Sequence, residues 1–109
     1  MAWLLRDGEV LASVEVASSL MAKSRGLLGK KNYEGAMLLR GTRSVHTIGM
    51  RFAIDVAFLS DDLRVVATTT LRRQRIALPH RGGRSVLEAE AGAFERWNLL
   101  AGDHLEIKG

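Results

Sequence analysis

The segment VHTIGMRFAIDVAFL, residues 45–59, decides how this chain is expected to fold. Val56 and Phe58 alternate with their neighbours, which is the period of a strand, and strands are expected at 44–48 and 54–60. Gly49 lies between them and permits backbone angles that other residues avoid. Met50 and Phe52 can then pack on one side while Arg51 points to the other. The segment therefore predicts a glycine bend between two strands at the centre of a β domain.

Extended segments flank this centre on both sides. Residues 2–6 and 9–16 indicate a hairpin, because Asp7-Gly8 readily takes the positive φ angles of a tight turn. Other elements follow from periodicity and turn residues: strands at 36–40, 64–71, 84–90 and 104–108, and short helices at 18–30 and within 91–103, the second with Phe94, Trp97 and Leu100 inward. Short strands without β–α–β alternation favour a mainly β (α+β) fold, a compact antiparallel β-sandwich or barrel with two short helices.

Length and composition limit the classes of protein that fit. A chain of 109 residues fits one domain, 1–109. It contains no cysteine, which excludes disulfides, thiolate nucleophiles and cysteine-ligated metals. No stretch has the about 7–15 unbroken apolar residues of a secretory signal or the ~20 of a membrane span. We expect a soluble, cytoplasmic protein.

Known motifs for phosphate and metal binding fit this sequence poorly. Residues 26–31, GLLGKK, have two residues between the glycines where a phosphate loop needs four, and helix termination explains them better. The histidines, His46, His80 and His104, show no i, i+3 or i, i+4 pairing typical of a helical metal site. A site assembled from separate strands, such as His46 with Asp55 and Glu88, stays open. We expect no metal and no cofactor.

Catalysis is one interpretation of the same polar residues. His46 could act as a general base, with Asp55 or Glu88 assisting, since neutral imidazole suits that role. No serine stands in a nucleophile elbow, and no nucleophile is identified. The alternative is structural: His46 fills a polar niche beside the sheet, and Asp55 hydrogen-bonds a turn.

An arginine-rich segment is the other candidate site. Residues 63–87 contain no acid, and residues 72–84, predicted to form a loop, hold five arginines, of which Arg72, Arg73 and Arg75 are the closest together. Guanidinium groups can bind phosphate or carboxylate through paired hydrogen bonds. Nucleic-acid binding is the weaker alternative, because the segment has no aromatic residue on which bases could stack. A solvated loop without a partner is the third.

The central segment also carries a resemblance. Together with RGLLG at 25–29, VLEAEAG at 86–92 and LAGD at 100–103, it resembles the family catalogued as domain of unknown function 192, over residues 14–107. The resemblance implies a compact, mainly antiparallel β fold with short helices and no established activity. It also implies site candidates at the motif positions: His46, Gly49, Met50, Arg51, Asp55 and Glu88.

Three functional hypotheses follow. The first is a binding module with a pocket near His46, Met50, Arg51 and Asp55, with Glu88 as a further contact, for a small anionic ligand or a partner protein. The second is a hydrolase-like enzyme that uses His46 with Asp55 or Glu88. The third is a nucleic-acid binder that uses residues 72–84. The enzyme requires its three side chains to meet in one hydrogen-bonded network.

Overall fold

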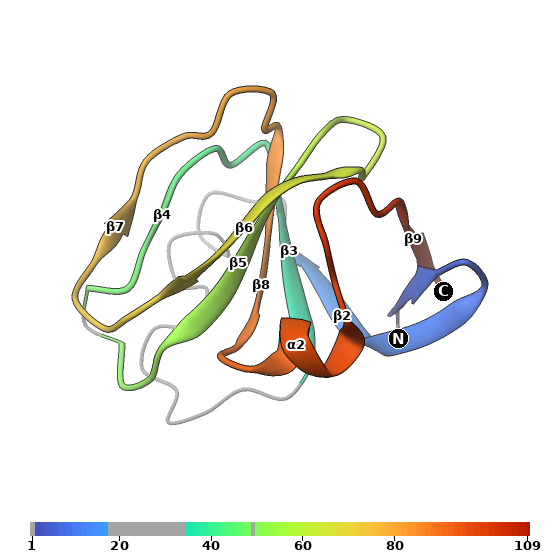
Figure 1. Ribbon diagram of the computed structural model, residues 1–109, viewed down its shortest axis with the longest axis horizontal. Helices are drawn as coiled ribbons and strands as arrows, with labels where there is room; N and C mark the ends of the chain where they lie inside the picture. The colour runs from blue at the N-terminus through green and yellow to red at the C-terminus, as the bar shows by residue number, and fades with distance from the viewer. Residues whose placement is uncertain (1, 18–34, 49) are drawn as a thin grey trace.

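The computed structural model of the chain describes residues 2–17, 35–48 and 50–109 (Figure 1). The helix expected at 18–30 and the bend expected at Gly49 lie outside these residues. Nine strands and one short helix, α2 (Ala93–Trp97), are present in the described part. Within that part, no helix is long and apolar enough to span a membrane.

Seven strands form one curled sheet in the spatial order β6-β5-β8-β3-β2-β1-β9. Their bounds are β1 (Ala2–Arg6), β2 (Glu9–Ala17), β3 (Ala36–Arg40), β5 (Ile54–Leu59), β6 (Val65–Leu71), β8 (Ser85–Glu90) and β9 (Leu105–Lys108). Two further strands, β4 (Val45–His46) and β7 (Ile76–Ala77), pair with each other in a small ribbon at the side of the molecule opposite β9 (Figure 1).

The prediction of a mainly β fold is confirmed, and several details differ. The strands form a single sheet with a ribbon where a sandwich or barrel was expected, and β2 and β3 pair in parallel. A parallel pair needs a long connection, which the intervening residues 18–34 have the length to supply. The segment expected to be a loop contains β7. The predicted hairpin is present, with positive φ at Asp7 and Gly8.

The middle strands of the sheet are buried on both faces. Every residue of β5 is buried, as are all but the last residues of β3 and β8. On what we call the helix face, side chains pack with α2; they include Leu38, Ala57, Leu59, Leu87 and Phe94. On the opposite face, which we call the ribbon face, the core side chains contact Val45 of β4 and Ala77 of β7; they include Met37, Met50, Ile54, Val56 and Phe58. Neighbouring residues of a central strand therefore lie in different cores.

The way in which the helix ends places Leu99 in the core, where Leu100 was expected. Asn98 follows α2 in the left-handed conformation, with φ 53°, and its N–H bonds the carbonyl oxygens of the last turn. This change of direction buries Leu99 and leaves Leu100 59% exposed. The expectation that Leu100 points inward is therefore wrong, whereas Phe94 is buried and Trp97 half-buried as expected.

A close backbone approach at the start of β3 gives a test of the packing. Gly35 has φ +90°, and a Cβ there would lie 2.7 Å from Ser13 Oγ and 2.9 Å from the Ser13 carbonyl oxygen. Gly8 has a similar φ, +80°, with open space around it. We expect Gly8→Ala to lower the free energy of unfolding by about 1 kcal/mol through its backbone angle alone. Gly35→Ala should cost about 3 kcal/mol, because overpacking adds to that strain.

Urea denaturation of the two variants measures this difference. Equal losses of stability would show that Ser13 moves aside freely and that β2 and β3 are not closely packed at this point.

Candidate functional site

The ribbon brings together two charged segments that are far apart in the sequence. In its register, Val45 lies opposite Ala77 and His46 lies opposite Ile76. Val45 and Ala77 pack toward the ribbon face of the sheet. Since residues directly opposite share a side of the ribbon, His46 and Ile76 both lie on its outer side, where they are exposed.

Thr47 fixes the two segments to each other. Its N–H donates to the Arg75 carbonyl oxygen at 2.8 Å, and its own carbonyl oxygen accepts from Gln74 N–H at 3.2 Å. Its hydroxyl group donates to the Arg72 carbonyl oxygen, and the hydroxyl oxygen accepts from Arg75 N–H at 2.9 Å. The side chain is fully buried, so these hydrogen bonds form away from water, where leaving a polar group unpaired costs most.

Arg51 is held close to Thr47 through its neighbour Met50. Met50 N–H donates to the Thr47 carbonyl oxygen at 3.0 Å, so the residue that precedes Arg51 is bonded to the same threonine. Met50 is buried, Phe52 is half-buried against the same core, and Arg51 is exposed, as the sequence predicts. Thr47 is not among the site residues predicted from the sequence, where its one signal is a hydroxyl residue between His46 and Ile48.

The two described segments that meet at Thr47 carry basic side chains and no acidic ones. No acidic residue occurs between Glu34 and Asp55 or between Asp62 and Glu88. The arginines of these two segments, apart from Arg64, are exposed and form no ion pair with any described carboxylate: Arg40, Arg43, Arg51, Arg72, Arg73, Arg75, Arg81 and Arg84. We call five residues anchored around Thr47 the basic ribbon: His46, Arg51, Arg72, Arg73 and Arg75. Exposed cations without nearby acids create a positive potential that attracts anions.

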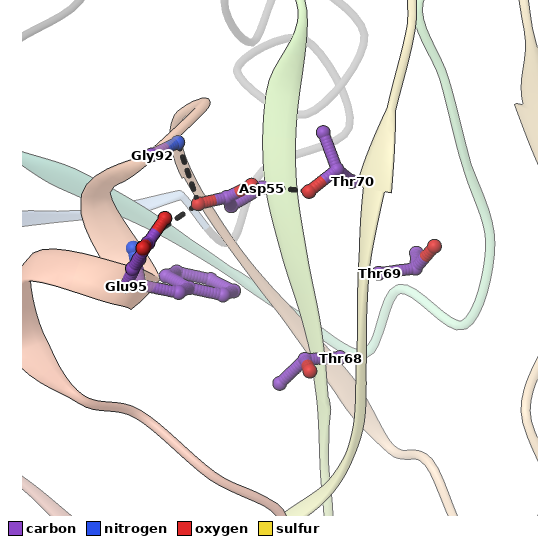
Figure 2. A pocket seen from close by; sticks show the side chains of 7 residues that line it. Asp55, Thr68, Thr69, Thr70, Gly92 and Glu95 are labelled. Carbon is purple, nitrogen blue, oxygen red and sulfur yellow. Dashed lines mark hydrogen bonds between the residues drawn. The ribbon is translucent and has the colours of Figure 1, made fainter.

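Asp55 lies elsewhere, on the helix face, and its carboxylate is already occupied. Figure 2 shows it between β6 and the start of α2. One oxygen accepts from the Thr70 hydroxyl at 2.8 Å, and the other accepts from Gly92 N–H at 2.9 Å and Phe94 N–H at 3.1 Å. The helix begins after Gly92, which has no side chain to cap it. Asp55 therefore caps α2 from a neighbouring strand.

A shallow hollow lies beside Asp55. Its volume is about 220 Å³, and its lining includes Thr68, Thr69, Thr70 and Glu95 (Figure 2). Since the Asp55 carboxylate accepts three hydrogen bonds from the protein, one of them from Thr70, the side chains left to meet a solute on this face are Glu95 and Thr68. The hollow belongs to a different surface from the basic ribbon, because Asp55 and the ribbon lie on opposite faces of the sheet.

Glu88 is buried on the ribbon face. In the sheet it lies between Met37 of β3 and Val56 of β5, and it is 3% exposed. Burial raises the pKa of Glu88 to about 7. Among the described residues, no cation offsets this effect. The carboxyl group therefore exchanges its proton near neutral pH, within an apolar environment.

The structure separates the residues that the hydrolase-like hypothesis groups. Val56 is the partner of Glu88 in the ladder, and Ala89 is the partner of Asp55, so the two acids point to opposite faces. His46 lies on the outer side of the ribbon. The described side chains of His46, Asp55 and Glu88 thus form no common network. The pocket expected from His46, Met50, Arg51 and Asp55 is likewise divided, because Met50 is in the core.

The other histidines are engaged locally. His80 stacks on Phe58 with ring centroids 5.7 Å apart, and the Nε2 atom of His104 lies 2.6 Å from the Asp62 carbonyl oxygen. Within the residues that the structure describes, no three histidine or acidic side chains gather closely enough to hold a metal ion.

The fold and the ribbon define a small, mainly β domain, and comparison with known proteins identifies its family. The profile of the family DUF192, described as "Uncharacterized ACR", matches residues 2–107. The chain belongs to this family, as its motifs suggested. It is similar to the UPF0127 protein of Pyrococcus furiosus, with 33% identity over 103 residues, which are 90% of this chain and 89% of that one. A UPF0127 protein of Pyrococcus horikoshii is 34% identical over 98 residues, 85% of each chain.

Solved structures agree on the fold. A crystal structure of a protein of unknown function from Novosphingobium aromaticivorans has a TM-score of 0.76 and 21% identity, covering 96% of this chain and 82% of that one. A crystal structure from Sinorhizobium meliloti, of a protein described as a candidate transcription regulator, has a TM-score of 0.81 and 21% identity, covering 96% and 90%. At this level of identity the likeness shows a shared fold alone.

Asp55 as a helix cap gives one test. Asp55→Ala removes the acceptor of two backbone N–H groups, and we expect it to lower the free energy of unfolding by about 3 kcal/mol. Asp55→Asn keeps one carbonyl oxygen for those groups and should cost less than half as much. Urea denaturation measures both, and hydrogen exchange at Gly92 and Phe94 should accelerate in the alanine variant. Slow exchange at both amides in that variant would contradict the capping role.

Glu88 gives a test through pH. The ordinary pKa of the group is 4.5 and burial raises it to about 7. Between these values the unfolded chain has lost a proton that the folded protein keeps, so the free energy of unfolding falls as pH rises. Above pH 7 the loss levels off at about 3 kcal/mol, since each pH unit of difference is worth about 1.4 kcal/mol.

Glu88→Gln should remove this dependence, so that the variant exceeds the native protein in stability at pH 8 and matches it at pH 4. The measurement is urea denaturation between pH 4 and 8. Glu90→Gln is the control, because it leaves Glu88 in place and should retain the pH dependence. A Glu88→Gln variant whose stability falls over the same range as the native protein would refute the assignment.

Proposed function

We propose that the protein is a single-domain binding module for an anionic ligand or partner, and that the basic ribbon is its site. The observation that carries this proposal is the set of hydrogen bonds around Thr47. They hold the segments of His46, Arg51, Arg72, Arg73 and Arg75 at one place on the surface. The proposal keeps the anion-binding arginines expected from the sequence and joins them to the histidine of the family motif.

The state of the arginines supports anion binding. They are exposed, and within the described residues none is paired with a carboxylate, so an incoming anion displaces no internal partner. Guanidinium groups bind phosphate and carboxylate oxygens in pairs, with more geometric definition than a lysine offers. Backbone atoms of their segment are held by a buried threonine, which reduces the entropy that would be lost if a ligand had to order the loop.

The remaining motif residues have structural roles in the proposal. We propose that Met50 positions Arg51 by filling the core, that Glu88 lies beneath the ribbon as part of the same core, and that Asp55 holds α2. None of the three is needed as a direct contact. We also propose that the protein acts in the cytoplasm, since a chain without cysteine is compatible with a reducing compartment.

A polyanion titration tests the proposal. With inorganic tripolyphosphate as the probe, we expect amide shifts concentrated at residues 46–51 and 72–76. Arg73→Gln/Arg75→Gln should raise the Kd about tenfold, which corresponds to roughly 1.4 kcal/mol from two exposed charged contacts. Both substitutions leave the backbone bonds to Thr47 intact.

The matched control is Arg96→Gln/Lys108→Gln. Each double variant lowers the formal net charge by two, from +4 to +2, but the control positions lie on α2 and β9. The control should bind within about twofold of the native protein. Equal weakening in both variants would mean that net charge alone attracts the probe, and the basic ribbon would lose its assignment.

A further inference from the structure

The outer side of the ribbon is apolar as well as basic. Ile76 is 61% exposed, Leu78 is 75% exposed and Ile48 is 50% exposed. Single exposed apolar side chains are ordinary, but a group of them on one small element marks a surface that meets a partner. Ile48 is two residues beyond His46, and Ile76 and Leu78 belong to the facing segment, so the three flank the same short ribbon.

The alternation of the ribbon explains why these groups are exposed. Val45 and Ala77 fill the ribbon face of the sheet, which turns the intervening side chains outward. A strand that only covered the sheet would carry polar residues on its outer side. Here the outward positions carry Ile76 and Leu78 beside Arg75 and Arg81, which combines an apolar surface with uncompensated positive charge.

We infer that the basic ribbon docks the protein on the surface of an anionic lipid bilayer. This inference rests on the proposed anion-binding function and names the source of the anion, the phosphate groups of the lipid heads. Arg72, Arg73 and Arg75 contact those phosphates, and Ile76 and Leu78 enter the boundary between head groups and acyl chains. Such a surface attracts nearby arginines electrostatically, and buried apolar area adds to the binding.

A bilayer accounts for both the positive charge and the exposed apolar side chains of the ribbon, whereas nucleic acid accounts for the charge alone. The described aromatic side chains near the ribbon offer no stacking platform: Phe52 is half-buried, and Phe58 is buried and stacked with His80. A nucleic acid held through its phosphates would leave Ile76 and Leu78 in water. In the boundary region of a bilayer the same side chains leave water while the arginines keep their phosphate partners.

Co-sedimentation with unilamellar vesicles tests the inference. We expect the native protein to bind vesicles of phosphatidylcholine with 30% phosphatidylglycerol and to stay unbound with phosphatidylcholine alone. Arg73→Gln/Arg75→Gln should lower the partition coefficient about 30-fold, since each arginine near an anionic surface contributes about fivefold. Ile76→Ser/Leu78→Ser should lower it at least tenfold through the loss of apolar burial.

The control for the apolar pair is Val10→Ser/Leu100→Ser. These side chains are 58% and 59% exposed, on β2 and after α2, and their loss should change the partition coefficient less than twofold. Amide spectra of all variants establish that each is folded. Equal losses in the two serine variants would overturn the inference, because general surface hydrophobicity would then explain vesicle binding.

Two further arms separate this inference from the function on which it rests. Tripolyphosphate binding at the ribbon without vesicle binding would overturn the lipid inference and leave the anion-binding proposal in place. Binding to a 20-base-pair DNA duplex that exceeds vesicle binding and is insensitive to Ile76→Ser/Leu78→Ser would also overturn it, in favour of nucleic acid. If the protein binds neither tripolyphosphate nor anionic vesicles, the lipid inference and the anion-binding proposal are both overturned.

Discussion

Burial of β3, β5 and β8 on both faces is the constraint on which the rest of the structure depends. Side chains such as Leu38, Val56 and Leu87 are fully removed from water, and each buried side chain of this size contributes about 2 kcal/mol to the stability of the sheet. In such strands a polar residue has no solvent on either side. Each one must find a local partner, as Asp55 does, or lose its charge, as Glu88 does near neutral pH.

These two acids show why the residues grouped by the hydrolase-like hypothesis do not meet in the middle of the sheet. Their ladder positions are adjacent, but alternation sends Asp55 to the helix face and Glu88 to the ribbon face. Asp55 uses all its hydrogen bonds to tie β5 to β6 and α2. Glu88 stands among apolar neighbours. At the periphery, by contrast, the one buried hydroxyl of Thr47 joins the two segments of an exposed, charged ribbon.

Local patterns in the sequence predicted the local parts of the fold. Asp7-Gly8 specified the hairpin, and the apolar periods specified β3, β5 and β9 to within one residue. The parts that were missed depend on contacts between distant segments. The two-residue strand β7 has no period of its own and lies near Pro79; only its pairing with β4 defines it. For the same reason, exposed arginines could be predicted, but their position beside His46 could not.

Positive charge is concentrated on one side of the molecule, and the net charge of +4 does not show this asymmetry. Among the described residues, the ion pair of Arg6 with Asp103 and the contact of His104 with Asp62 lie around β9, where acidic and basic side chains occur together. The ribbon lies at the opposite side of the sheet (Figure 1) and carries cations without acids. A charge distribution of this kind turns the protein toward a negative surface before contact. If the proposed function holds, the ribbon reaches that surface first, and the residues that steer the encounter are the same ones that are proposed to bind.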